Sequence, residues 1–448
     1  MLLLMMMMMM MTARPCLVVG EGLTPGNPTW NMPFLTPDKP DGGASVLPGV
    51  EYLRLFFASK TQGTYNMSPM LSFLNGMWLA SFKNSPRDED QPGQRVLYSQ
   101  SLDGIAWTDP SDASVAAPSL SGWANASQPV GVLPPPAAAV APRELFPNIS
   151  TESHHAALFA EPTVLVNGRV YAAASPKQFC LYPDQYSSVL LLRQVYDGAL
   201  DSLGPVFWAS KTVPSGWEEN SAVHAIPTVL SMPAETQGDV AVLLNNATYA
   251  PCAAQSTLPG HTTKCEFCYD GCQNWTATAN VTILENERTH YLLPGTGDVI
   301  LYRSKGSHVP NFLYASKRPN FASPWPVPSR TNITDDVANL NAGNLPDGRA
   351  YLVSNAMVGP FRNPLYVSRT DDTNLRFVDT DVIVSCEMPI FTSPHQPFGC
   401  EQRVRGGAKQ GGCQYPQALA ITGGDFYTIF SLNKEDIWLL RFPISEMN

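Results

Sequence analysis

Two adjacent histidines and a glutamate form the group of side chains in this sequence best suited to proton transfer. His154 and His155 lie in a predicted loop shortly before Glu161. An imidazole titrates near neutral pH, so His155 and Glu161 could act as general base and general acid in hydrolysis or in a lyase reaction on a uronate, with His154 binding substrate. Paired loop histidines also occur without any chemical role. The sequence holds no Ser/His/Asp spacing, H-E-x-x-H, P-loop or G-x-G-x-x-G pattern, which argues against protease, ATPase and dehydrogenase functions.

Strands must position these side chains, and residues 65–110 contain the clearest strand pattern. Two apolar runs flank Asn75-Gly76, a pair typical of a two-residue hairpin turn. A third run, 95–100, leads into SLDGIAW at 101–107, which has the spacing of an Asp-box turn. In such a turn the Asp accepts backbone N–H bonds, the Gly adopts a positive φ and the Trp packs between sheets. The motif is therefore structural and marks one repeat unit.

The same order of strand, turn and strand recurs loosely along the chain. The units begin near residues 65, 161, 224, 290, 343 and 415. Six such units predict an all-β fold, a six-bladed β-propeller, with a β-sandwich plus a β-rich appendage as the alternative. We expect the strand 51–59 to pair with the last unit and close the ring. Residues 14–50 are expected to run over the surface, and 111–151 and 250–282 to form insertions, the first an exposed loop.

Composition argues against several classes of partner. The 448 residues carry a net charge of −10 without a cluster of Lys and Arg, so neither nucleic acid nor an anionic membrane is expected to bind. The apolar residues 1–13 are too short to span a bilayer and have the length of a signal-peptide core, although a misassigned start is the alternative. We predict a secreted monomer with no membrane span. No loop such as D-x-D-x-D-G is present, so no metal or cofactor is predicted.

Sequons and cysteines also favour an oxidising compartment. N-x-S/T sequons occur at Asn66, Asn125, Asn148, Asn246, Asn274, Asn280 and Asn332. Of the nine cysteines, Cys252, Cys265, Cys268 and Cys272 gather in one segment and Cys386, Cys400 and Cys413 in another. The first group could bind zinc, but the sequons beside it make disulfides the preferred interpretation. The odd count leaves one thiol over, for which Cys16 and Cys180 are the candidates.

Five stretches resemble proteins of the sialidase superfamily with BNR/Asp-box repeats, especially a sialidase-like branch common in environmental microbes. They are GTYNMSP (63–69), EDQPGQRVLYSQSLDGIAW (89–107), NAGNLPDGRAYLVSN (341–355), RNPLYVS (362–368) and QYPQALAITGGDFYTIFSLNKEDIWLLRFPI (414–444). In the last, the Y-P motif and the NKEDI ending follow the order of the family. The resemblance implies a sialidase-like propeller over residues 51–448 and a glycan or polysaccharide substrate.

Roles for individual residues follow from the same resemblance. Tyr415 lies where the family's nucleophile would lie, and Asp90, with Asp88 and Glu89 as near alternatives, stands near the position of the acid/base. Arg362 matches an arginine that clamps the carboxylate of the sugar. A neutral phenol approaches an oxocarbenium ion beside a carboxylate with less repulsion than a carboxylate nucleophile would, and guanidinium groups hold the acid group by paired hydrogen bonds.

Further substrate-binding candidates lie in the two stretches of the first repeat. They are Tyr65, Asn66 and Arg95. Each of the candidate residues also has a simpler interpretation: a packed core tyrosine for Tyr415, a solvated acidic loop for Asp90 and a surface ion pair for Arg362.

Departures from the family pattern leave two functional hypotheses. Where sialidases have R-I-P, this sequence has Asn66-Met67-Ser68-Pro69. The family position of the tyrosine-activating glutamate falls near 341–343, where no glutamate occurs. A further arginine position of the family falls near Asn355. The sequence therefore predicts that two of three clamping arginines and the glutamate are absent. The first hypothesis is a secreted glycoside hydrolase acting on a glycan that is not necessarily a sialoside. The alternatives are a polysaccharide lyase and a non-catalytic propeller that binds glycan or protein.

Overall fold

The regular structure in the described part of the chain consists almost entirely of β-strands. The computed structural model describes residues 26–32, 43–89, 91, 93–114, 120, 122–127, 141–148, 155–179, 189–196, 199–210, 239, 275–278, 281–306, 311–323, 325–336, 338–355, 362–391, 402–403, 411–421 and 424–447. Within these ranges the only named helices are two short 3₁₀ turns, η1 (Pro389–Phe391) and η2 (Ile444–Met447). No helix in this part of the chain is long and apolar enough to cross a membrane.

The strands form five sheets, in each of which successive strands are hydrogen-bonded neighbours. The first sheet is β3 (Tyr65–Leu74), β4 (Met77–Ser85), β5 (Arg95–Ser101) and β7 (Glu144–Phe146); the second is β8 (His155–Val166), β9 (Arg169–Phe179), β10 (Val189–Val195) and β11 (Leu203–Ser210). The third is β12 (Trp275–Thr278), β13 (Val281–Leu292), β14 (Asp298–Gly306), β15 (Asn311–Arg318) and β16 (Ser329–Asp335). The fourth is β17 (Asn341–Asn344), β18 (Ala350–Ser354), β19 (Leu365–Thr370), β20 (Arg376–Val384) and β1 (Thr29–Trp30); the fifth is β21 (Cys413–Ala420), β22 (Asp425–Leu432), β23 (Asp436–Pro443), β2 (Glu51–Phe56) and β6 (Ala124–Asn125).

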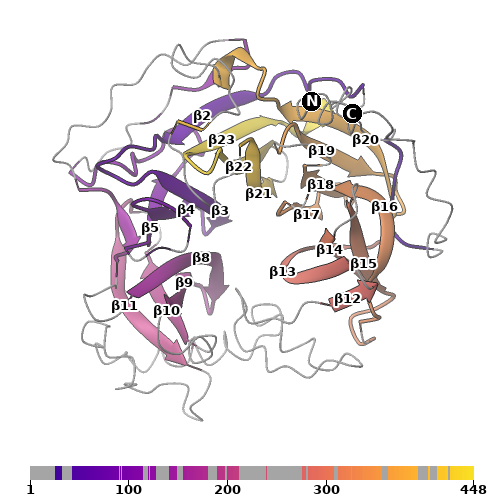
Figure 1. Cartoon of the computed structure of the whole chain (residues 1–448), viewed down its shortest axis with the longest axis horizontal. Coiled ribbons are helices and arrows are strands. Elements are labelled where there is room, and N and C mark those ends of the chain that lie inside the picture. Colours follow the sequence, from indigo (N-terminus) through magenta and orange to yellow (C-terminus); the bar gives the residue numbers. More distant parts are fainter. Residues whose placement is uncertain are drawn as a thin grey trace, which may run out of the picture.

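The five sheets stand around a common centre. Figure 1 shows β8, β3, β21, β17 and β13 innermost, and neighbours in this series contact one another from β8 to β13. Two sheets packed face to face would not place five strands around one axis, so the β-sandwich alternative is wrong. The third predicted unit, 224–245, lies outside the described residues apart from Asp239. The expectation of six blades therefore stays a prediction.

The strand 51–56 pairs with the last unit, as predicted. Strand β2 pairs antiparallel with β23, with Tyr52 opposite Leu440 and Arg54 opposite Trp438. Segments expected at the surface also enter the sheets: β1 pairs parallel with β20, and Leu145 of β7 is buried. Parts of 14–50, expected to run over the surface, and of 111–151, expected to form an exposed loop, thus add edge strands to the sheets.

The turns of the first repeat have the predicted chemistry. Asn75 and Gly76 both adopt positive φ, at 50° and 77°, as a mirror-image two-residue turn requires. At the end of β5, the Asp103 carboxylate accepts N–H bonds from Ile105 and Ala106, each at 2.8 Å. These bonds outweigh the opposing effect of burial and lower the pKa of Asp103.

An aromatic cluster beside this turn joins the first sheet to the fifth. Trp107 is fully buried, and its ring centroid lies 6.2 Å from that of Trp78. Trp78 in turn lies 4.3 Å from the ring of Tyr427 on β22. A side chain added at Gly104 would meet the Tyr427 hydroxyl at 2.7 Å, so this approach of the two sheets needs a glycine.

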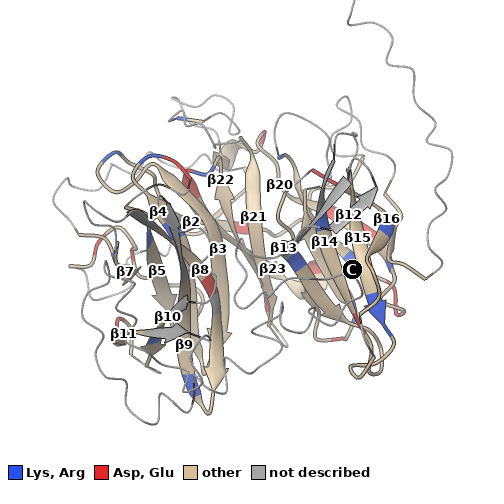
Figure 2. Cartoon of the chain, turned by 60° about the horizontal axis from the view of Figure 1, so that its bottom comes forward, with Lys and Arg blue, Asp and Glu red and all other residues tan. Residues whose placement is uncertain are grey.

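Apolar side chains fill the space between neighbouring sheets, and the strand bodies carry few charges. In Figure 2 the strands are mostly tan, with Lys, Arg, Asp and Glu largely toward their ends and in the connections. Cys413 is a free thiol at the core, where burial raises its pKa, and Cys386 is disulfide-bonded. Cys413 is therefore unpaired, in contrast to the expectation that the leftover thiol is Cys16 or Cys180, which both lie outside the described residues.

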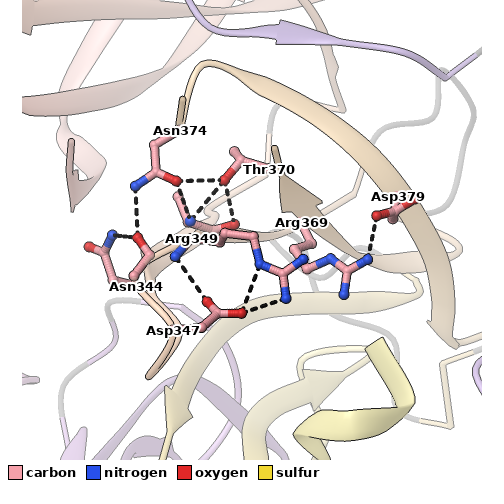
Figure 3. A network of polar contacts seen from close by, with 9 residues as sticks. Asn344, Asp347, Arg349, Arg369, Thr370, Asn374 and Asp379 are labelled. Carbon is pink, nitrogen blue, oxygen red and sulfur yellow. Dashed lines mark hydrogen bonds and ion pairs between the residues drawn. The ribbon is translucent and has the colours of Figure 1, made fainter. Parts of the chain in front are cut away.

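A network of polar side chains ties together the strand ends and turns of the fourth sheet (Figure 3), and Asn374 extends it to the third sheet. Asn374, at φ 56°, accepts hydrogen bonds from the Ala350 amide and the Thr370 hydroxyl. Its amide nitrogen donates to the carbonyls of Leu292 in β13, at 2.9 Å, and of Gly348, at 2.8 Å. Asn tolerates this left-handed backbone conformation better than most residues, so one side chain fixes both the turn and the contact between the sheets.

Replacing Asn374 with alanine is expected to lower the free energy of unfolding by about 1–3 kcal/mol, because the change leaves buried backbone groups without partners. Chemical denaturation of both proteins measures the difference. Asp347→Asn, at an exposed turn in the same network, is the control and is expected to cost about 0.5 kcal/mol or less. Equal stability of the Asn374 variant and the wild type would show that the network adds nothing.

Candidate functional site

Two inner strands carry irregularities where they approach the centre. The register of β21 shifts between Gln414 and Gln417, and Tyr415 has φ 55°. The register of β3 shifts between Met67 and Met70, and Ser68 has φ 48°. A proline follows each of these two residues. Positive φ is uncommon for residues other than glycine and tends to occur where a side chain must point in a required direction.

Tyr415 lies in a small cluster with side chains from the first sheet. It is 6% exposed and packs with the fully buried Tyr65 and Met67. Its hydroxyl is hydrogen-bonded to the guanidinium of Arg303, from β14. The guanidinium of Arg362 lies 5.5 Å from the Tyr415 ring centroid, and the ammonium of Lys434 lies 5.8 Å from it. Three cationic side chains from three sheets therefore surround one phenol.

Arg362 is held by the segment that leads into β21. Its Nη1 donates to Oε1 of the fully buried Gln414 at 2.7 Å, and its carbonyl accepts the Cys413 amide at 2.8 Å. A side chain at Gly412 would lie 2.4 Å from the Arg362 carbonyl oxygen, so only glycine allows this close pairing. The backbone that presents Tyr415 thus also positions Arg362.

A half-buried carboxylate lies between two lysines near Tyr65. Glu89 lies 3.0 Å from the ammonium of Lys434 and 3.9 Å from that of Lys83, and it accepts a hydrogen bond from Tyr65. Burial alone would raise the pKa of Glu89, but the two ammonium groups outweigh it and hold the pKa below its ordinary value. Burial lowers the pKa of Lys434, and Arg362 and Arg303 add to this effect while Glu89 opposes it.

Two aspartates at the end of β16 face the arginines. Asp335 is 3% exposed, and Asp336 interacts electrostatically with Arg362, Asp335 and Arg303. Burial, the largest effect, raises the pKa of Asp336 to about 8. The site therefore combines a phenol, three cations and a carboxyl group that is largely protonated at neutral pH, an arrangement suited to an anionic ligand and to proton transfer.

Several predicted site residues lie in or beside this cluster. Tyr415, Arg362 and Tyr65 come together as expected. Asn66 is fully buried; its amide nitrogen donates to the Glu435 carbonyl at 2.7 Å and its amide oxygen accepts from Asn84 at 2.7 Å. Since the Asn66 backbone amide also donates to the Lys434 carbonyl, Asn66 fixes the turn that carries Lys434.

Other candidates lie apart from the cluster or outside the described residues. Arg95, on β5, forms an ion pair with Glu144 at 2.5 Å and donates to Asn84. Glu161 is half-buried on the inner strand β8. His155 begins β8 opposite Phe179, so the prediction that it lies in a loop is wrong, because the strand extends further than its apolar pattern. Asp90 and His154 are not among the described residues.

A second arginine lies beside Tyr415, and the sequence did not predict it. Arg303 supplies a second guanidinium beside Tyr415, from β14 rather than from the region of Asn355. The sequence contains a signal for it, since Arg303 interrupts the apolar run DVILYRS of a strand. Asn341, near the expected glutamate, instead accepts the amide of Ala418 at 3.1 Å. Where β13 pairs with β14, Leu284 lies opposite Arg303 and the next paired residue is Arg288. The intervening residues 285–287 form a bulge and include two glutamates.

Comparison with known proteins identifies the fold. A solved protein described as "Sialidase" matches with a TM-score of 0.60 at 18% identity, over 93% of this chain and 35% of that chain. This chain thus spans about a third of that protein's length. A Trypanosoma rangeli sialidase mutant with trans-sialidase activity matches with a TM-score of 0.44 at 10% identity, over 90% of this chain and 60% of the other. No protein-family model and no curated protein matches the sequence.

Proposed function

From a sialidase-like fold that brings Arg303, Arg362 and Lys434 close to Tyr415, we propose that the chain is a glycoside hydrolase acting on a glycan that carries an acidic sugar. The observation that carries the proposal is the Tyr415 phenol, which is hydrogen-bonded to Arg303 and lies within 5.8 Å of two further cationic groups. Arginine and lysine side chains at the same place complement a carboxylate or sulfate group. Glycoside hydrolases are also the class to which the structural neighbours belong.

Tyr415 is the nucleophile in this proposal. Its oxygen loses its proton to water and bonds to the anomeric carbon as the glycosidic bond breaks. A second water then attacks the anomeric carbon, its hydroxyl stays on the sugar, and its proton restores the tyrosine O–H. The guanidinium of Arg303 stabilises negative charge on the phenol oxygen and, together with Arg362 and Lys434, holds the acid group of the sugar. Asp90 keeps its predicted role as the acid that protonates the leaving oxygen.

Secretion remains part of the proposal. The sequons at Asn125 and Asn148 are exposed and accessible to a glycosyltransferase, which supports it. The sequon at Asn66 is fully buried, and Asn332 uses its amide group to bond both the amide and the carbonyl of Trp30. We therefore expect glycans at Asn125 and Asn148 rather than at these two positions.

Product release from a glycan panel tests the function. The panel contains sialosides, uronate-containing polysaccharides, sulfated glycans and neutral glycans, and both reducing ends and unsaturated products are measured. We expect new reducing ends from an acidic glycan, with kcat/KM lowered about 10²–10³-fold by Arg303→Met, because one stabilising donor is lost. Arg349→Met, at an exposed turn where Arg349 pairs with Asp347, is the control and is expected to keep full activity.

Other results would point to the alternatives. Unsaturated products would indicate a lyase, and cleavage of neutral glycans alone would contradict the role of the cationic cluster. Binding of an acidic glycan without any cleavage would favour a non-catalytic propeller.

A further inference from the structure

Asp336 has a buried carboxyl oxygen that the proposed reaction does not use. Its Oδ2 is buried and, in the part of the chain that is described, has no hydrogen-bond partner. The Asp336 amide donates to the Asn355 carbonyl at 3.2 Å, and the Asn355 side chain donates to the Arg362 carbonyl at 3.2 Å. Asn355 Oδ1 likewise is buried and lacks a partner among these residues. Two polar atoms beside the Arg362 segment are thus desolvated without compensation, which is costly unless a ligand or water satisfies them.

The charges around Asp336 decide its protonation state. Three charged groups act on it: the neighbouring Asp335 at the end of β16, Arg362 ahead of β19 and Arg303 from β14. Burial disfavours the carboxylate and is the largest effect; Arg362 and Arg303 oppose it and Asp335 reinforces it, with the pKa at about 8 as the result. A neutral carboxylic acid offers an O–H donor that a carboxylate lacks.

We propose that Asp336 binds the acid group of the substrate as a neutral carboxylic acid, donating its O–H to an anion that Arg303 and Arg362 also hold. The inference rests on the proposed function, in that it assumes an anionic sugar at the cationic cluster. An uncharged donor adds a hydrogen bond to the bound anion without repelling it. An ionised Asp336 would repel the anion and compete with it for both guanidinium groups. Binding therefore requires the proton on Asp336, and the substrate is excluded as that proton is lost.

Binding of acidic monosaccharides as a function of pH tests this coupling. N-acetylneuraminate and D-glucuronate are titrated into the full chain by isothermal calorimetry between pH 6 and 9, with D-glucose as the neutral control. We expect the affinity of the wild type for an acidic sugar to be constant below pH 8 and to fall about tenfold per pH unit above it, since one proton is coupled to binding. Asp336→Asn keeps an uncharged donor of similar shape. Its affinity for the acidic sugar should therefore fall between pH 8 and pH 9 by a factor at least threefold smaller than that of the wild type.

Two further variants and a spectrum separate the possible outcomes. Asp336→Ala is expected to bind at least threefold more weakly than Asp336→Asn at pH 6, because it lacks the donor. Asp379→Asn, at an exposed carboxyl on β20, should keep the pH dependence of the wild type. Infrared difference spectra should show a neutral carboxylic acid at pH 7 that is absent in Asp336→Asn.

The outcomes distinguish this inference from the proposed function. Equal pH profiles of the wild type and Asp336→Asn, in the presence of clear binding, would overturn the role of Asp336 and leave the proposed function standing. Absence of the neutral carboxyl band would also overturn the role of Asp336 and leave the proposed function standing. Failure of both acidic sugars to bind at every pH, together with activity on neutral glycans only, would overturn both.

Discussion

Tyr415→Phe is expected to reduce glycan cleavage by about 10³-fold or more, because the variant keeps the ring and removes the atom that would bond to the sugar. The phenylalanine ring still packs against Tyr65 and Met67 and faces Arg362. The fold should therefore survive, and only the hydrogen bond to Arg303 is lost. Initial rates on whichever panel glycan the wild type cleaves, measured beside a circular dichroism spectrum and a melting curve, give the comparison.

A matched Tyr→Phe change elsewhere controls for the lost hydroxyl. Tyr98, on β5, is buried and donates to Asp201 at 2.9 Å, away from the inner strands. Tyr98→Phe should lower stability by about 1 kcal/mol and leave the cleavage rate unchanged. Wild-type rates in Tyr415→Phe would remove Tyr415 from the mechanism and would return attention to His155 and Glu161.

Asp336→Asn is expected to change the pH dependence of stability. The pKa of the Asp336 carboxyl is about 8 in the folded chain and has its ordinary, lower value in the unfolded chain. The folded chain therefore holds this proton more tightly. The stabilisation is complete at pH values below the unfolded pKa and is lost as the pH rises through about 8. Relative to the variant, the wild type should lose about 2–4 kcal/mol between pH 5 and 8, since each unit corresponds to about 1.4 kcal/mol.

Urea denaturation at several pH values measures this difference. The variant should be the more stable protein at pH 9, where the wild type must bury a charge that asparagine lacks. Asp379→Asn removes an exposed carboxyl and should parallel the wild type throughout. Parallel curves for wild type and Asp336→Asn would mean that Asp336 is ionised in the folded chain across this range.

Local patterns in the sequence were sufficient to predict most of the fold. Asn75-Gly76 dictates a tight hairpin because both residues accept positive φ, and the run 51–59 had the apolar character of a strand that could complete the last sheet. The short strands β1, β6 and β7 could not be predicted in this way. They have two or three residues each and owe their conformation to the sheet edges that they join.

Residues of the site could be predicted from the sequence only where they belong to a motif. Tyr415 and Arg362 belong to stretches with a family resemblance, and they do lie together. Arg303 and Asp336 lie outside these stretches, and their approach to Tyr415 depends on how whole sheets are arranged around the centre. Spacing along the sequence does not encode that arrangement, which is why the sequence predicted that no arginine takes the family position near Asn355 but did not predict that Arg303 of β14 lies beside Tyr415.

The pairing of β2 with β23 has a consequence for synthesis on the ribosome. Strand β2 is synthesised early, but it cannot pair with β23 until nearly the whole described chain has been translated. Tyr52 of β2, for example, pairs with Leu440 of β23. Strand β21, with Tyr415, belongs to that same last sheet. Contacts so distant in sequence form slowly because a long loop must close first. A nascent chain that stalls before residue 415 thus lacks the phenol, and activity should appear only upon completion of the ring.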